Sequence, residues 1–283
     1  MKVRILLLFG LTFLAIPAWT QVRQNDSLHS RFQVGLGYDQ DFFIDGYAQV
    51  REFQYNGTHL SLPQDLGMKT WSNVSLEASY TFQNRSSLRA SFAYFFFPGI
   101  SKLDHDIWFN ATNLIGQNGL SIYKTQLFES RICWIKPVRL IPKIQTSFIV
   151  GFLYDGLIFR INGDILPDSP RKEPKEDFIS QALPYPEIGF LLNKPIRQRS
   201  SVSLEATGTY IPLFKSFFVE GGHMYLNYYS VSSDLGYKYS LKHFFINPSI
   251  QFRTFRTYEN SEEDTNDFYI ISAGIKLKIG VRF

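Results

Sequence analysis

The stretch Ile271–Phe283, ISAGIKLKIGVRF, has the regularity that decides the fold. Apolar residues occupy every second position, and polar or small residues fill the positions between them up to Phe283. Successive side chains of a strand point to opposite faces of its sheet, so this period of two predicts a strand with one apolar and one polar face. A strand that crosses a bilayer needs one face for lipid and one for a polar lumen. The stretch therefore predicts a transmembrane β-strand.

The same two-faced pattern recurs along the chain, in a sequence rich in aromatic residues (27 Phe and 16 Tyr). Aromatic strands of this kind are typical of membrane barrels with aromatic girdles. A soluble periplasmic β-sandwich or barrel would also alternate, but outward Tyr and Phe on so many strands would give a soluble monomer too large an apolar surface. The repeated pattern covers Val74–Phe82, Leu88–Phe96, Ile144–Tyr154, Val202–Tyr210 and Phe244–Phe252.

The connections between these strands alternate in length, which fixes the topology. Outer-membrane barrels have short periplasmic turns and long outer loops. We expect short turns at Gln83–Ser87, Lys136–Pro142, Asn193–Ser200 and Tyr239–Lys242. We expect long connections at Tyr55–Lys69, Gly99–Gly119, Asn162–Leu183, Pro212–Gly222 and Tyr258–Asp267.

Five long loops and four short turns predict an all-β fold, a transmembrane antiparallel up-and-down β-barrel of about ten strands. Phe43–Phe53 is then the first full crossing. Arg31–Tyr38 either extends that crossing or crosses separately. The second possibility would require a further strand elsewhere and a twelve-stranded barrel, because the number of strands is even.

The polar faces of these strands carry charges of both signs, which we expect to line the lumen and pair with one another. A barrel of about ten strands has an interior that side chains largely fill, so a general diffusion porin is disfavoured. The expected lumen-lining charges are Glu77, Arg89, Glu129, Arg131, Glu205, Arg253, Lys276, Lys278 and Arg282.

The N-terminal residues predict export. Residues 1–20 have basic residues, then an apolar run from Ile5 to Ile16, as a secretory signal peptide does. We expect residues 21–30 to be a short periplasmic segment and residues 31–283 to form a barrel in the outer membrane of a Gram-negative bacterium. No later apolar run reaches the ~20 residues of a membrane helix, which excludes a helical membrane protein. The net charge of +4 gives no argument for nucleic acid.

Few residues have a pattern that predicts chemistry. The lone Cys133 offers no disulfide, metal or redox motif, and none of the five histidines has a metal-ligand spacing, so we expect no metal and no cofactor. The triplet Asp104, His105 and Asp106 in an outer loop could act as a carboxylate-oriented general base, and His223 could serve a lipid-cleaving site. A solvated loop explains both features more simply.

The run Asn56–Met68, NGTHLSLPQDLGM, is the most distinctive stretch outside the strands. Its glycines and its proline punctuate three leucines, which predicts an ordered loop that returns to the barrel wall. It could fold inward as a constriction or a ligand platform. The simpler explanation is that it only closes the first outer hairpin.

The loop Gly57–Gly67 and the C-terminal strand Ile271–Phe283 together resemble uncharacterised bacterial outer-membrane β-barrel proteins, and the strands rich in Tyr and Phe are similar to those of Bacteroidetes. The resemblance implies an outer-membrane barrel and transfers no catalytic residue. Phe283 also resembles the terminal aromatic signal that barrel-assembly machinery reads.

The sequence thus favours a barrel with a structural, binding or narrow-transport role in the cell envelope. The alternative is an outer-membrane hydrolase that acts on lipid or peptide at the extracellular rim. Expected partners are outer-membrane lipid and lipopolysaccharide, the barrel-assembly machinery and a small-molecule ligand, with no nucleic acid.

Overall fold

The structure, a computed structural model, describes residues 31–283 except 53–58, 66, 97–106, 111–112, 116–120, 163–174, 217–223 and 261–263. The predicted signal peptide and the segment 21–30 lie outside the described residues. Within the described part, no helix is long and apolar enough to span a bilayer. The strands are β1 (Phe32–Glu52), β2 (His59–Ser61), β3 (Thr70–Thr81), β4 (Ser87–Phe96), β5 (Ile107–Asn110), β6 (Asn113–Ile115), β7 (Ser121–Val138), β8 (Gln145–Asn162), β9 (Lys175–Arg197), β10 (Ser200–Ser216), β11 (Met224–Ser240), β12 (Phe244–Asn260) and β13 (Asp264–Arg282).

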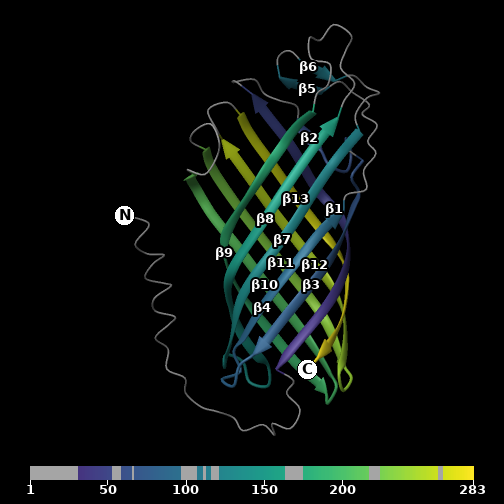
Figure 1. Cartoon of the computed structure of the whole chain (residues 1–283), viewed down its shortest axis with the longest axis vertical. Coiled ribbons are helices and arrows are strands. Elements are labelled where there is room, and N and C mark those ends of the chain that lie inside the picture. Colours follow the sequence, from purple (N-terminus) through teal and green to yellow (C-terminus); the bar gives the residue numbers. More distant parts are fainter. Residues whose placement is uncertain are drawn as a thin grey trace. The chain divides into compact units, whose positions relative to one another are not determined.

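Ten of these strands form a closed antiparallel barrel (Figure 1). The ring runs β1-β3-β4-β7-β8-β9-β10-β11-β12-β13, and β13 pairs with β1 to close it. The short strand β2 adds to one edge of β1, and β5 and β6 form a separate hairpin. The prediction of ten strands is confirmed and the alternative of twelve is wrong, because residues 32–52 form one continuous strand paired along β13.

The exterior of the barrel is apolar, as the alternation of residues predicts. In β13, Ile275, Leu277 and Ile279 are about half exposed, with 62%, 46% and 53% of their surfaces accessible. Lys276 and Lys278, between them, point to the interior and make ion pairs there. An all-around apolar exterior cannot face water, so this belt of exposed aliphatic and aromatic side chains requires a lipid environment.

The short turns lie at one end of the barrel, called here the turn end. The opposite end, where β1, β4, β8, β10 and β12 end, is called the loop end. Short turns join β3 to β4, β7 to β8, β9 to β10 and β11 to β12 at the four predicted places, but two predicted turns are too long: residues 136–138 belong to β7 and residues 193–197 belong to β9.

Three predicted long loops are wrong in extent. Parts of them belong to strands: residues 175–183 to β9, 212–216 to β10, 258–260 to β12 and 264–267 to β13. Only residues 261–263 separate β12 from β13. Polar residues continue these ladders; Glu259 pairs with Asn266 and Asn260 with Thr265. Strand pairing does not end where the lipid-facing residues end, because the backbone still gains its hydrogen bonds in water.

The segment His59–Lys69 returns to the wall, as its sequence predicts. The backbone N–H of Leu62 donates to the carbonyl of Gly46 at 2.9 Å, and Asp65 accepts from the N–H of Ser61 at 2.7 Å. Gly67 has a φ of 61°, a left-handed conformation that costs glycine little. The side chains of Leu60, Leu62 and Met68 are almost fully buried among other apolar residues. The segment therefore folds inward at the loop end.

Closure of the barrel depends on small residues where β13 meets β1. A Cβ added at Gly274 would collide with the backbone carbonyl of Gln40 and the side chain of Asp41. At Gly208, on β10, an added Cβ would meet its nearest atom, the Ser230 carbonyl oxygen, at 3.4 Å. The wall thus has no room for a methyl group at Gly274, whereas it has room for one at Gly208.

We predict that Gly274→Ala destabilises the folded barrel by about 1–3 kcal/mol or more through overpacking, whereas Gly208→Ala changes stability by less than about 1 kcal/mol. Urea titration of detergent-refolded protein, read as the fraction that migrates as a compact band without boiling, measures both. Equal midpoints for the two variants would contradict the tight contact at the closing seam.

Candidate functional site

The interior of the barrel contains ion pairs that cross the lumen. Arg89 on β4 and Glu205 on β10 form a bidentate pair, with nitrogen–oxygen distances of 2.7 and 2.5 Å. At least three strands separate β4 from β10 in either direction around the ring, so the pair bridges the lumen and not the wall. Lys278 on β13 likewise reaches Glu77 on β3 at 2.7 Å, past the intervening strand β1.

A second set of charges surrounds Arg131 on β7. Its guanidinium lies 3.1 Å from Glu129 and 3.2 Å from Glu187 on β9. Glu129 also lies 3.6 Å from Arg253 on β12, across the barrel. The side chains of these charged residues are 2–16% exposed, so water screens them weakly and loss of one partner would leave a charge in a poor environment.

A buried carboxylate fixes β1 against its neighbours. Asp41 is fully buried; it accepts hydrogen bonds from Trp71 Nε1 and from Gln251 Nε2, both at 2.6 Å. The Arg253 guanidinium lies 4.9 Å from the Phe95 ring centroid and 5.8 Å from that of Trp71, which are cation–π distances. These contacts join the charged layer to the aromatic side chains next to it.

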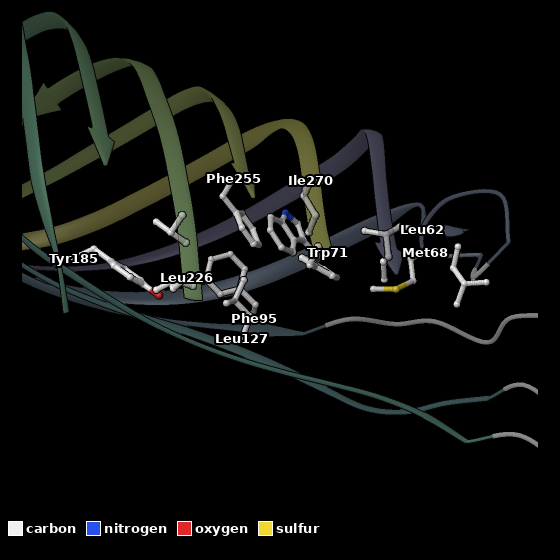
Figure 2. Packing of buried hydrophobic residues seen from close by; sticks show 13 residues of the cluster. Leu62, Met68, Trp71, Phe95, Leu127, Tyr185, Leu226, Phe255 and Ile270 are labelled. Carbon is white, nitrogen blue, oxygen red and sulfur yellow. The ribbon is translucent and has the colours of Figure 1, made fainter. Parts of the chain in front are cut away.

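Toward the loop end the interior becomes apolar, which is unusual for a membrane barrel with a polar lumen. Figure 2 shows side chains from several strands converging there, with Tyr185 and Leu226 together and Leu62 and Met68 farther along. The set is called here the apolar cluster. It comprises Ala48, Leu60, Leu62, Met68, Trp71, Phe95, Leu127, Tyr185, Leu226, Tyr228, Phe255, Phe268 and Ile270.

The charged and apolar layers meet around a small cavity. A cavity between them has room for about one water molecule, with a volume near 20 Å³. Glu129, Arg131, Asp155, Tyr228 and Arg253 border it on the polar side, and Phe255 on the apolar side. The described interior is thus packed with side chains and is not a wide aqueous channel.

The structure brings together most of the charges expected in the lumen. Seven of them make the ion pairs described above: Glu77, Arg89, Glu129, Arg131, Glu205, Arg253 and Lys278. An eighth, Lys276, lies 3.5 Å from Asp39. Arg282 lies apart at the turn end, where it donates to Ser240 Oγ at 2.6 Å. The Phe283 backbone N–H donates to the carbonyl of Phe32 at 2.9 Å, next to the closing seam.

Sequence analysis missed several interior acids: Asp39, Asp41, Asp155 and Glu187. Asp39 and Asp41 lie before Phe43–Phe53, the predicted first crossing. They alternate with Tyr38, Gln40 and Phe42, a period-two signal that could have found them. Glu187 follows Pro184 and Pro186, which obscure the strand.

The candidates for catalysis, Asp104, His105, Asp106 and His223, lie outside the described residues. Within the described ranges, no group of three or more His, Cys, Asp or Glu side chains is placed to hold a metal ion. Cys133 is buried, and its thiol lies 3.4 Å from Glu187 Oε2.

No protein-family model matches the chain, and no curated protein matches it. Among solved structures it is similar to the outer membrane protease OmpT from Escherichia coli, with a TM-score of 0.48 and 12% identity over 92% of this chain and 100% of that one. It is also similar to the outer membrane protein OprG from Pseudomonas aeruginosa (TM-score 0.32, 10% identity, 90% and 96% covered). A third is the Pseudomonas putida toluene transporter TodX (TM-score 0.31, 9% identity, 88% and 89% covered).

These similarities are too low to transfer a function. The class of the protein follows from its own strand pairing, its apolar exterior and its ion-paired interior: it has the architecture of an outer-membrane β-barrel.

We predict that Arg89→Met destabilises the barrel by about 3–5 kcal/mol, because Glu205 keeps its charge in the interior without a partner. The double variant Arg89→Met with Glu205→Gln should recover most of that loss. Urea midpoints of refolded protein measure both, with the exposed Lys136→Met as the control expected to behave like the wild type. A double variant no more stable than the single one would argue against a specific pair.

Proposed function

We propose that this chain is an exported outer-membrane barrel of a Gram-negative bacterium that acts through its surface, in a structural or binding role, and does not conduct solutes through its lumen. The observation that carries the proposal is the packed interior. Pairs that cross the lumen, such as Arg89–Glu205, occupy one layer, and the apolar cluster fills the next. A pore needs a continuous path between such groups.

The placement in a membrane is supported by the limits of the apolar belt. On β12, Ile250 and Phe252 are 63% and 40% exposed, whereas the next outward positions are Thr254 and Arg256. The belt thus ends about halfway along β12, and the remainder of the strand extends beyond it at the loop end. In the proposed orientation the loop end faces the cell exterior, as long connections do in this class.

A polar and aromatic patch on the exterior lies just beyond the belt at the loop end. Arg256 donates to Asp267 at 2.8 and 2.6 Å, and Tyr47 O–H donates to Asp267 at 3.2 Å. The Tyr269 ring centroid lies 5.5 Å from that of Tyr47. Tyrosines are enriched where a barrel meets the interface, and the Arg256 side chain, 40% exposed, keeps N–H groups for a further acceptor.

This patch supports lipopolysaccharide as the partner. Its headgroup phosphates and sugars would lie at the height of the patch, where an arginine binds phosphate and tyrosine rings stack on sugars. The barrel-assembly machinery and a small-molecule ligand of the loops are further proposed partners.

We predict that the purified protein gives no stable current steps in planar lipid bilayers. The packed interior leaves no hydrated path for ions. A general diffusion porin, inserted in the same bilayer, is the positive control. Reproducible steps of porin size would overturn the closed lumen.

We predict that Arg256→Gln lowers lipopolysaccharide binding by roughly threefold, the effect of an exposed charge at an interface. Lipid that co-purifies with the barrel, quantified by native mass spectrometry, gives the readout. Lys136→Gln, at the turn end, is the matched control and should retain wild-type binding. Equal loss in both variants would mean that only net charge matters and would contradict a specific patch.

A further inference from the structure

The barrel wall has a place where main-chain pairing stops. Strand β10 pairs with β9 from Ser200 to Gly208, and the last pair is Gly208–Ile188. Beyond it, β9 continues toward the loop end paired only with β8, and β10 continues paired only with β11. Both strands are described along their whole length, so the interruption is a feature of the wall itself. Residues 184–187 and 209–212, the two sides of this interruption next to the last pair, are called here the seam.

Prolines explain why the ladder stops at this place. Pro184 and Pro186 stand in β9 immediately beyond Ile188, and proline has no N–H to donate. Neighbouring residues of a strand direct their N–H groups to opposite sides. Since the β8–β9 ladder runs past both prolines without a shift, the missing donors are those that would face β10. Pro212 lies at a register shift on the opposite side of the seam.

The seam lies within the lipid-facing belt. Phe152, paired with Pro186, is 62% exposed, and Val231, paired with Gly208, is 46% exposed. Tyr210, on the seam itself, is 67% exposed. Lipid cannot satisfy unpaired backbone groups, so an open ladder at this depth is energetically costly.

Behind the seam the two layers meet: Glu187 belongs to the charged layer, and Tyr185 belongs to the apolar cluster. Tyr185, on the seam, is 4% exposed, and its ring stacks on that of Tyr228 with centroids 4.1 Å apart and planes 5° apart. Tyr228 O–H donates to the Asp155 carboxylate, and this hydrogen bond holds the Tyr228 ring in place. Leu127 and Leu226 belong to the same cluster, and both are almost fully buried.

We propose that the seam is a lateral port that admits an acyl chain of an outer-leaflet lipid to the apolar cluster, with the Tyr185–Tyr228 stack as its inner closure. The inference goes beyond the proposed function and rests on it for the membrane placement. An acyl chain is the ligand that matches the surroundings at the Tyr185 end of the seam, because hydrocarbon lies outside it and side chains of the apolar cluster lie inside it. In the structure the stack is closed, so entry requires the Tyr185 ring to move.

The test uses the full-length barrel refolded into phosphatidylcholine vesicles that contain a phospholipid with a diazirine on its acyl chain. After illumination, mass spectrometry maps the labelled residues. Labels on Phe152 and Val231 report the exterior belt, and labels on Leu127, Tyr185 and Leu226 report the interior. We expect both groups to be labelled. Exterior labels without interior ones would overturn the port and leave the membrane placement intact, whereas absence of exterior labels would overturn both.

Two variants make the test specific to the seam. Pro184→Val with Pro186→Val restores two N–H donors toward β10, and we expect interior labelling to fall roughly tenfold with exterior labelling unchanged. Pro248→Val, at an exposed strand proline on β12, is the matched control and should label like the wild type. Unchanged interior labelling in the double variant would overturn the port.

Should the double variant fail to refold, Tyr185→Ala tests the closure from the other direction. Removal of one ring of the stack should raise labelling of Leu226 several-fold, because the path into the cluster is then open. Labelling of Leu226 at the wild-type level in Tyr185→Ala would overturn the role of the stack.

Discussion

The pairing of the last strand with the first is the constraint on which this molecule depends. A sheet in lipid has no solvent for the backbone groups on its edges, so it must close on itself. The ladder from Gln33–Arg282 to Glu52–Asp264 supplies that closure along the full length of β1. A closed wall has one face turned to lipid and one turned inward. The polar groups on the inward face must then find their hydrogen-bond and ion-pair partners inside the barrel.

The interior meets this requirement in two ways. Where the inward residues are charged, partners come from distant strands, as in the pair Arg89–Glu205 and the contact of Arg253 with Glu129. Where they are apolar, the returning segment with Leu62 and Met68 completes the packing from the loop end. The boundary between the two layers is Asp41, held by one aromatic and one amide donor. Polar and apolar contents thus meet around a cavity that has room for about one water molecule.

Much of this fold was predictable, because alternation is a local property of the sequence. The strict period of two in residues 271–283 identified β13, its two faces and the barrel class together. The ends of the strands were less predictable. Acidic residues such as Glu259 indicated a loop, but outside the membrane an acidic residue is solvated equally well in a loop or in a strand. Which interior charges meet was not predictable, since Arg89 and Glu205 become neighbours only through the curvature of the closed sheet. The seam depends on proline placement relative to a neighbour that sequence alone does not identify.

The lumen pairs also affect the order of events in folding. Arg89 and Glu205 are 116 residues apart in the chain and touch only across a completed ring. We expect contacts that need a completed ring to form late in folding, and contacts that are absent from the transition state slow unfolding without speeding folding. The ion pairs inside this barrel therefore contribute less to the rate of folding than to the lifetime of the folded protein.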